Sequence, residues 1–142
     1  MIKKTGVLFI VCTLIFCSGC ANSEVLTEAD VECPDSPNCV SSKAAKPEHF
    51  IEPFTFEDTH GEAMKRLKSA LLNEKRTTIV SEKDDYLHAE IRSFIFRFVD
   101  DVEFTLLVEE GVIHLRSSSR TGYSDFGVNR RRMERIRKRF QK

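Results

Sequence analysis

The segment Val102-Glu103-Phe104-Thr105-Leu106-Leu107-Val108 has the alternation that decides the fold class. Its even-numbered residues are all apolar, whereas Glu103 and Thr105 are polar. Successive side chains of a strand point to opposite faces of a sheet, so the segment predicts a strand with one apolar and one polar face. Antiparallel sheets commonly bury one face and leave the other in water, and we expect that arrangement here.

The same period of two extends over the neighbouring sequence. β-Branched and aromatic residues are concentrated in segments 77–81, 86–92, 94–99, 102–108 and 112–118, which we predict to be strands. The connections between them are marked by Asp84-Asp85, Asp100-Asp101 and Glu109-Glu110-Gly111. Such short connections predict hairpins, and hence antiparallel pairing of neighbouring strands.

A helix is expected on each side of the strands. Residues 61–72 have apolar side chains at helical spacing, and Thr59 with Glu62 fits a capping box at the start. The second helix is predicted to begin at Ser124 or Asp125, because either residue is an acceptable N-cap. Its apolar stripe consists of Met133, Ile136 and Phe140.

The order helix, strands, helix predicts an α+β fold: an antiparallel meander of four to five strands with two helices packed on one face. Residues 33–56 contain all four prolines of the chain, so we expect an ordered but irregular lead-in there. Residues 33–142 are therefore expected to form a single domain.

The N-terminus has the organisation of an export signal. Lys3 and Lys4 precede an apolar run over residues 7–16, and two small residues stand before Cys20. This pattern resembles the bacterial lipobox, in which the cysteine is acylated and becomes the new N-terminus. We predict a signal peptide over residues 1–19, lipidation of Cys20 and a lipidated tether over residues 20–32. The alternatives are ordinary secretion and a retained membrane anchor, although a spanning helix needs roughly twenty apolar residues.

Lipidation predicts a location in the cell envelope. Ala21, and not aspartate, follows the predicted acylated cysteine. By resemblance to Gram-negative sorting signals, this favours the periplasmic face of the outer membrane where the source has one. The membrane, reached through the lipid, is thus an expected partner, and export argues against nucleic acid as one.

Two cysteines remain for the domain. Cys12 and Cys17 lie in the predicted signal peptide and Cys20 is the predicted lipidation site, which leaves Cys33 and Cys39. In an oxidising compartment an even number of remaining cysteines usually indicates disulfide bonding, and we expect a disulfide between these two. The alternative is a redox or metal site, but the spacing is not that of a redox motif and no histidine follows at zinc-finger spacing. We expect no metal and no other cofactor.

Charge is distributed unevenly along the chain. Residues 130–142 carry eight Lys or Arg against one Glu, a net charge of +7, whereas residues 21–129 carry 12 basic and 21 acidic residues, a net charge of −9. A basic helix of this kind either neutralises an acidic body or contacts an anionic lipid or polymer. Both interpretations stay open at this point.

Two motifs carry a resemblance to a known family. Residues 33–42 read CPDSPNCVSS, and residues 117–130 read SSSRTGYSDFGVNR. Together with residues 96–104 they resemble the domain of unknown function 1499 family, over essentially the whole predicted domain. The resemblance implies a small bacterial envelope lipoprotein or membrane-attached protein, and it implies no particular activity.

The second motif, together with Arg116 just before it, also contains the best candidate site. Amides at a helix N-terminus and nearby arginines attract phosphate or carboxylate groups. The predicted anion- or partner-binding residues are Arg116, Arg120, Ser124, Asp125, Asn129 and Arg130. In the alternative, structural interpretation, Asp125 caps the helix, Arg120 pairs with Asp125, and Asn129 ties the turn together.

The leading functional hypothesis is a non-catalytic binding or envelope-integrity module, held in the envelope by lipid and binding an anionic small molecule or an envelope protein. The alternative is an ester or phosphoester hydrolase. It would use one of the serines 117–119 as nucleophile, with His88 or His114 as base and Asp100 or Asp101 as orienting residue. The Gly-x-Ser-x-Gly elbow of many hydrolases is absent, and we expect no catalysis.

Overall fold

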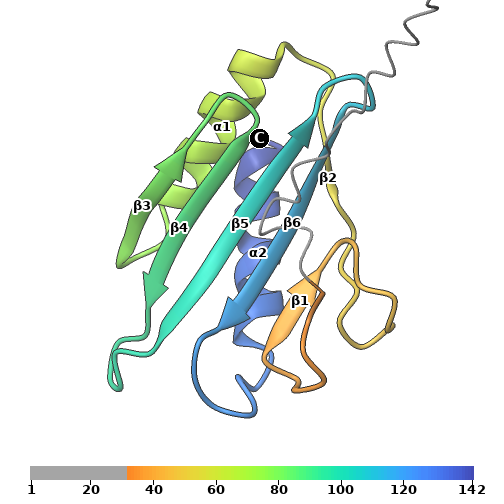
Figure 1. Ribbon diagram of the computed structural model, residues 1–142. Helices are drawn as coiled ribbons and strands as arrows, with labels where there is room; N and C mark the ends of the chain where they lie inside the picture. The colour runs from red at the N-terminus through yellow and green to blue at the C-terminus, as the bar shows by residue number, and fades with distance from the viewer. Residues whose placement is uncertain (1–31) are drawn as a thin grey trace, which may run out of the picture.

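The computed structural model describes residues 32–142, so the predicted signal peptide, Cys20 and almost all of the tether lie outside the described residues. The domain contains six strands and two helices (Figure 1). In chain order they are β1 (Cys39–Ser41), β2 (Phe54–Thr55), α1 (His60–Leu72), β3 (Thr77–Glu82), β4 (Tyr86–Arg92), β5 (Val99–Leu107), β6 (Val112–Ser119) and α2 (Val128–Phe140).

The strands form one antiparallel sheet in the order β1-β6-β5-β4-β3, with β2 also paired to β6. Strands β3 to β6 are the predicted meander, so the predicted α+β class and antiparallel topology are confirmed. The two further strands come from the proline-rich lead-in. Pro37 and Pro53 lie just outside β1 and β2 and remove no hydrogen bond from the sheet, which explains why short strands form there.

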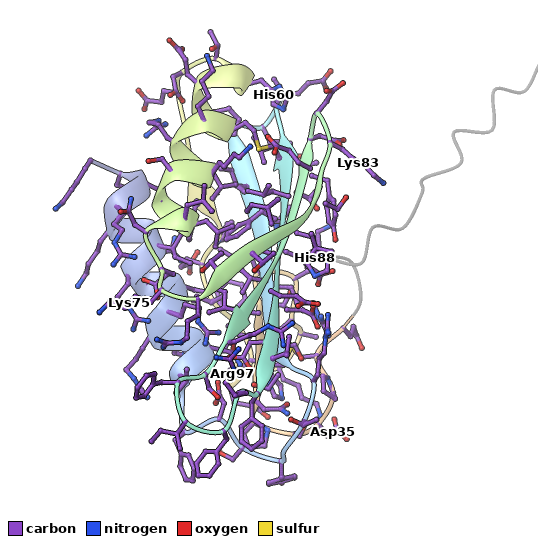
Figure 2. The ribbon with its side chains drawn as sticks, turned by 90° about the vertical axis from the view of Figure 1, so that its left-hand side faces the viewer. Asp35, His60, Lys75, Lys83, His88 and Arg97 are labelled. Carbon is purple, nitrogen blue, oxygen red and sulfur yellow. A yellow bond between two sulfur atoms is a disulfide. The ribbon has the colours of Figure 1, made fainter. Side chains whose placement is uncertain are left out.

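Both helices cover the same face of the sheet, and the opposite face, called the open face below, carries no helix of the described chain (Figures 1 and 2). The core lies between the two layers. Phe104 of β5, Phe54 of β2 and Phe140 of α2 are fully buried, and the Phe54 and Phe140 rings stack with centroids 5.6 Å apart. The predicted apolar stripe of the second helix is confirmed, because Met133 and Ile136 are also fully buried.

The first helix follows its prediction closely. Thr59 accepts a hydrogen bond from the amide of Glu62, and the Glu62 carboxylate accepts one from the amide of Thr59, so the predicted capping box is present. The second helix begins later than predicted, at Val128. Asp125 still accepts hydrogen bonds from the amides of Gly127 and Asn129, but Gly127 is in the left-handed region (φ 74°), so residues 120–127 form a loop before the helix starts.

The predicted strand over residues 94–99 is wrong. Residues 93–98 form the loop between β4 and β5, and β5 begins only at Val99. Asp100 and Asp101, predicted as a turn, instead lie inside β5, where they pair with Ile91 and Glu90 of β4. The aromatic residues of the loop suggested a strand, yet Phe94 and Phe96 are 76% and 72% exposed, so they face solvent at a hairpin tip and bury little surface.

Cys33 and Cys39 lie in disulfide geometry, with their Cα atoms 5.6 Å apart, as the predicted pairing requires. The bridge holds the start of the described chain beside the first residue of β1.

Neither helix of residues 32–142 is long and apolar enough to cross a membrane.

Candidate functional site

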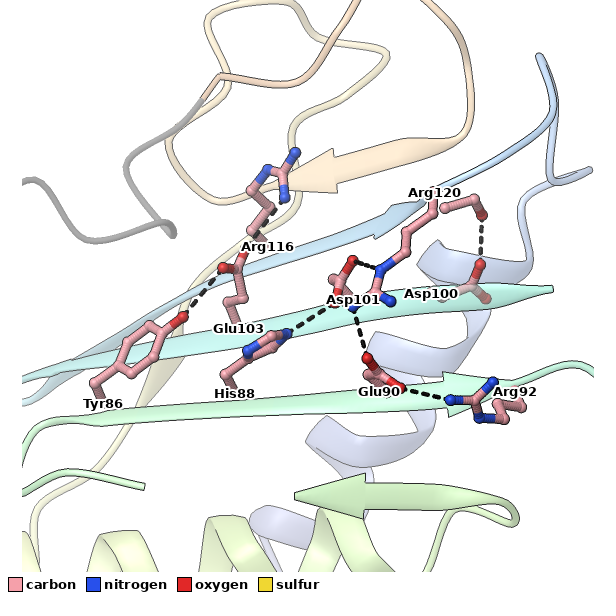
Figure 3. A network of polar contacts seen from close by, with 10 residues as sticks. Tyr86, His88, Glu90, Arg92, Asp100, Asp101, Glu103, Arg116 and Arg120 are labelled. Carbon is pink, nitrogen blue, oxygen red and sulfur yellow. Dashed lines mark hydrogen bonds and ion pairs between the residues drawn. The ribbon is translucent and has the colours of Figure 1, made fainter. Parts of the chain in front are cut away.

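The open face is lined by polar side chains of β4, β5 and β6, which alternate with the core residues of the same strands (Figure 3). At its centre Glu103 is almost fully buried (2% exposed). Its carboxylate accepts hydrogen bonds from the Tyr86 hydroxyl (3.1 Å) and from Arg116 Nη1 (3.1 Å). A buried carboxylate needs such donors, so Arg116 of the predicted site is engaged within the domain.

A second group of contacts joins the three strands nearer the loop of residues 93–98. Asp101 accepts hydrogen bonds from Arg120 Nε (2.7 Å) and lies 2.8 Å from His88 Nε2. The Arg120 guanidinium also donates to Glu90 (2.7 Å), and Glu90 accepts a further hydrogen bond from Arg92 (2.8 Å). Arg120 thus pairs with Asp101 and Glu90, and not with Asp125 as the structural interpretation expected.

These contacts shift the pKa values of Asp101 and Arg120. Burial acts to raise the pKa of Asp101, but the hydrogen bonds and positive charge of Arg120 and His88 outweigh burial and hold this pKa below its usual value. Hydrogen bonds to Asp101 and Glu90 raise the pKa of Arg120. Both residues are charged at neutral pH, and their charges are directed at each other.

Asn129, another residue of the predicted site, is fully buried between the sheet and α2. Its carboxamide oxygen accepts from the Ser117 hydroxyl (2.5 Å) and from Arg132 Nη1 (2.8 Å), and its nitrogen donates to the main-chain oxygen of Asn38 (3.0 Å). Asn129 therefore ties together β6, α2 and the segment before β1, whereas the structural interpretation expected it only to tie the turn.

The remaining predicted residues line a small pocket of about 250 Å³ between the β6–α2 loop and the segment around β1. Ser124, Asp125 and Arg130 lie there together with His49. Arg130 donates to the main-chain oxygens of Phe50 (2.7 Å) and Glu48 (2.8 Å). The structure therefore divides the six predicted residues among the open face, the interior and this pocket, and does not bring them to one site.

The structure brings the residues of the hydrolase alternative together only in part. Ser117 and Ser119 face the helices, where their hydroxyl groups donate to Asn129 and Asp100. His88 lies on the open face against Asp101, and His114 lies 3.0 Å from the hydroxyl of Ser42. Ser118 shares the open face but is paired across the strands with Cys39 and Asp101. The candidate base His88 and orienting residue Asp101 thus lie together on the open face, whereas two of the three candidate serines, Ser117 and Ser119, lie on the opposite face.

Among residues 32–142, no group of three or more His, Cys, Asp or Glu side chains is arranged to hold a metal ion. A larger cavity than the pocket around Arg130 lies elsewhere, in a part of the domain to which the sequence assigned no site. We call it the basic groove: an open cavity of about 460 Å³ between the end of α1, the end of β4 and α2. Its lining includes one carboxylate and six cationic residues, Lys75, Arg76, Arg92, Arg132, Arg135 and Arg139.

Some of these cations have partners. Arg132 donates to the buried Asp100 (2.6 Å), while Arg135 and Arg139 both contact Glu74. Burial acts to raise the pKa of Glu74, but hydrogen bonds and charge from the two arginines outweigh it and hold the pKa below its usual value. The sequence feature that indicates the basic groove is the run of arginines on α2. Their spacing of three and four residues puts several of them on one side of the helix.

A comparison with known families decides where the chain belongs. The profile of the family described as "Protein of unknown function (DUF1499)" matches residues 31–140. The chain is a DUF1499 protein. The match covers the whole described domain apart from its last two residues and confirms the resemblance drawn from the sequence motifs. Comparison with curated proteins and with solved structures gave no match.

The two sequence motifs of this DUF1499 protein meet at one end of the sheet. Asn38, from the first motif, donates to the main-chain oxygen of Gly122 (2.6 Å) and accepts from the amide of Ser119 (3.0 Å), both in the second. The motifs thus build a joint between the disulfide-closed segment, the end of β6 and the start of α2.

Proposed function

We propose that this chain is a lipid-anchored cell-envelope protein whose domain is a non-catalytic module that binds an anionic ligand in the basic groove. The observation that carries the proposal is the positive charge of that groove. Its six cationic residues meet three carboxylates: Glu74 in the lining, Asp100 paired with Arg132, and Glu90 paired with Arg92. Guanidinium groups bind phosphate and carboxylate oxygens through paired hydrogen bonds, and a cleft of one charge sign concentrates counter-ions.

The cations differ in their availability. Arg132 is buried and paired with Asp100, and Arg135 and Arg139 share Glu74. Lys75 and Arg76 are exposed residues of the groove lining, and Arg76 Nε donates to the main-chain oxygen of Arg92 (2.8 Å). We assign ligand contact to Lys75 and Arg76 and a supporting role to the paired arginines.

The envelope location rests on the N-terminal sequence. The lipobox-like pattern before Cys20 supports anchoring, and the residues that follow it provide a tether to the domain. Three residues of the site predicted from the sequence have a structural role in this proposal. The side chains of Arg116, Arg120 and Asn129 donate hydrogen bonds to partners inside the domain.

Photo-crosslinking in cells tests the proposal. A benzoylphenylalanine placed at Asn73, which lines the groove, is expected to capture the ligand, and intact-mass measurement of the adduct shows whether it is a small molecule, a lipid or a protein. The double variant Lys75→Glu with Arg76→Glu should lose the adduct. The matched control, Lys138→Glu with Lys142→Glu, makes the same charge change at exposed positions outside the groove and should keep it. An adduct that survives in both variants, or no adduct in either, contradicts ligand binding in the groove.

A further inference from the structure

One end of the domain presents large hydrophobic side chains to solvent. We call it the aromatic end and define it by Phe94, Ile95, Phe96 and Phe98 of the β4–β5 loop and Tyr123 and Phe126 of the β6–α2 loop. These six are 50% to 86% exposed, and they make up six of the ten exposed large hydrophobic residues in residues 32–142. Figure 2 shows rings projecting beneath the label of Arg97. Clustered exposure of this kind marks an interaction surface.

The two loops are held in shape by their own hydrogen bonds. The amide of Ser93 donates to the main-chain oxygen of Phe98 (2.9 Å), and the amide of Phe98 donates to the Ser93 hydroxyl (2.9 Å). In the other loop Asp125 accepts from the amide of Gly127 (2.8 Å). Arg97 and Phe126 have positive φ values of 57° and 53°, which non-glycine residues rarely adopt. The fold therefore fixes these side chains in exposed positions.

Cations surround the aromatic end. The Arg76 guanidinium lies 5.4 Å from the centre of the Phe94 ring, and Arg131 donates to the main-chain oxygen of Phe126 (2.8 Å). Arg97 is an exposed residue of the loop itself, and Phe94 also lines the basic groove. Apolar rings with arginines at their edge match the interface of a bilayer, where aromatic side chains lie at headgroup level and cations meet anionic lipids.

The tether joins the domain at this same end. Cys33 is bridged to Cys39, the first residue of β1, and Cys39 pairs with Ser118 near the end of β6. Asn38 contacts Gly122 of the β6–α2 loop. A tether over residues 20–32 spans at most about 45 Å when fully extended. Because this length exceeds the roughly 30 Å of β5, an anchor at Cys20 allows the aromatic end to reach the membrane, and the rings and arginines of that end favour it over the opposite end.

We infer that the aromatic end inserts into the headgroup region of the membrane that carries the lipid anchor. The rings enter the boundary between headgroups and acyl chains, and Arg76, Arg97 and Arg131 contact anionic lipid phosphates. The inference rests on the lipid anchor of the proposed function and adds an orientation: the open face stands roughly upright on the membrane, and the basic groove opens beside the lipid surface.

Tryptophan fluorescence tests the inference, because the natural chain contains no Trp. Phe96→Trp and Phe126→Trp each place one probe at the aromatic end. Val108→Trp is the matched control: Val108 is also exposed (54%) but follows the opposite end of β5, about 30 Å away along the strand. The full-length lipidated variants are reconstituted into phosphatidylethanolamine–phosphatidylglycerol vesicles with either ordinary or brominated acyl chains.

Brominated lipid is expected to quench the probes at positions 96 and 126 at least twofold and to leave the probe at position 108 unchanged. The inference is overturned if none of the probes is quenched, or if all three are quenched alike. It is also overturned if the position-96 probe is shielded from aqueous acrylamide but unaffected by brominated lipid, since that result indicates a protein contact.

Co-sedimentation separates the two proposals. Protein that sediments with vesicles while both aromatic-end probes stay unquenched refutes the inference alone, whereas wild-type protein that does not sediment refutes the lipid anchor as well.

Discussion

The side-chain nitrogen of Asn129 donates a hydrogen bond to the main-chain oxygen of Asn38, 91 residues away in the sequence and 3.0 Å away in the structure. This contact joins the two segments that carry the family resemblance. Because this contact lies in the interior, the motifs stabilise the fold at this end of the sheet. Some of their polar residues are therefore not available to a ligand.

Replacing this asparagine should therefore destabilise the domain. Asn129→Ala removes one hydrogen-bond partner each from Ser117, from Arg132 and from the Asn38 carbonyl oxygen in a fully buried place. A buried polar group left without a partner costs about 1–3 kcal/mol. Urea unfolding should show a loss of that size, whereas the neighbouring exposed Thr121→Ala should change little. Equal stability of Asn129→Ala and wild type would contradict the assigned role.

The disulfide should contribute measurable stability. In the chain-entropy model, closing a loop as short as that between Cys33 and Cys39 contributes about 2 kcal/mol. Protein purified from an oxidising compartment should lose about this amount on reduction, and Cys33→Ser with Cys39→Ser should match the reduced wild type. Detection of two free thiols in the unreduced protein would show that the pair is not bridged.

The fold class could be predicted because it depends on local patterns. The alternation around Phe104 and the capping box of Thr59 and Glu62 act over a few residues, and both were confirmed. The loop of residues 93–98 could not be predicted in this way. Its aromatic residues have high strand propensity, but propensity describes fit to a half-buried surface, and here the loop lies beyond the end of the sheet.

The candidate site was less predictable. Residues close together in the sequence were assigned to one site, but Arg116 and Arg120 lie on the open face whereas Asn129 is buried in the interior. The basic groove is formed by residues from α1, β4 and α2, far apart in the sequence. In the sequence, only the arginine spacing on α2 indicated this groove. The pairing of Glu74 with Arg135 and Arg139 depends on the packing of the two helices, which the sequence does not show.

Acid should weaken the contact between the two helices. The pKa of Glu74 is held below its usual value in the folded protein, so its contribution is present above the unfolded pKa of about 4.3 and is lost as the pH falls through the folded pKa. Glu74→Gln should be less stable at pH 7 and should decline less steeply below about pH 4. The exposed Glu109→Gln serves as control. Identical pH dependence of Glu74→Gln and wild type in urea unfolding would refute this linkage.

Two glycines should respond to alanine in opposite directions. Gly111 has a φ of 62°, and a Cβ there would lie 2.8 Å from the main-chain oxygen of Phe56, so Gly111→Ala should cost more than about 1 kcal/mol. Gly61 lies in α1 with nothing within 4 Å of an added Cβ, so Gly61→Ala should stabilise by about 0.5–1 kcal/mol. Thermal unfolding of both variants measures the difference, and changes of the same sign would contradict the geometry of the β5–β6 turn.

Acylation of Cys20 is the claim on which the envelope location and the membrane orientation both depend. The most direct test compares wild type, Cys20→Ala and the control Cys17→Ala by membrane fractionation with intact-mass measurement, with and without globomycin. We predict that wild type and Cys17→Ala carry a lipid and fractionate with membranes, that globomycin accumulates their unprocessed precursor, and that Cys20→Ala carries no lipid. A Cys20→Ala protein that is processed and bound to membranes in the same way as wild type would contradict the account.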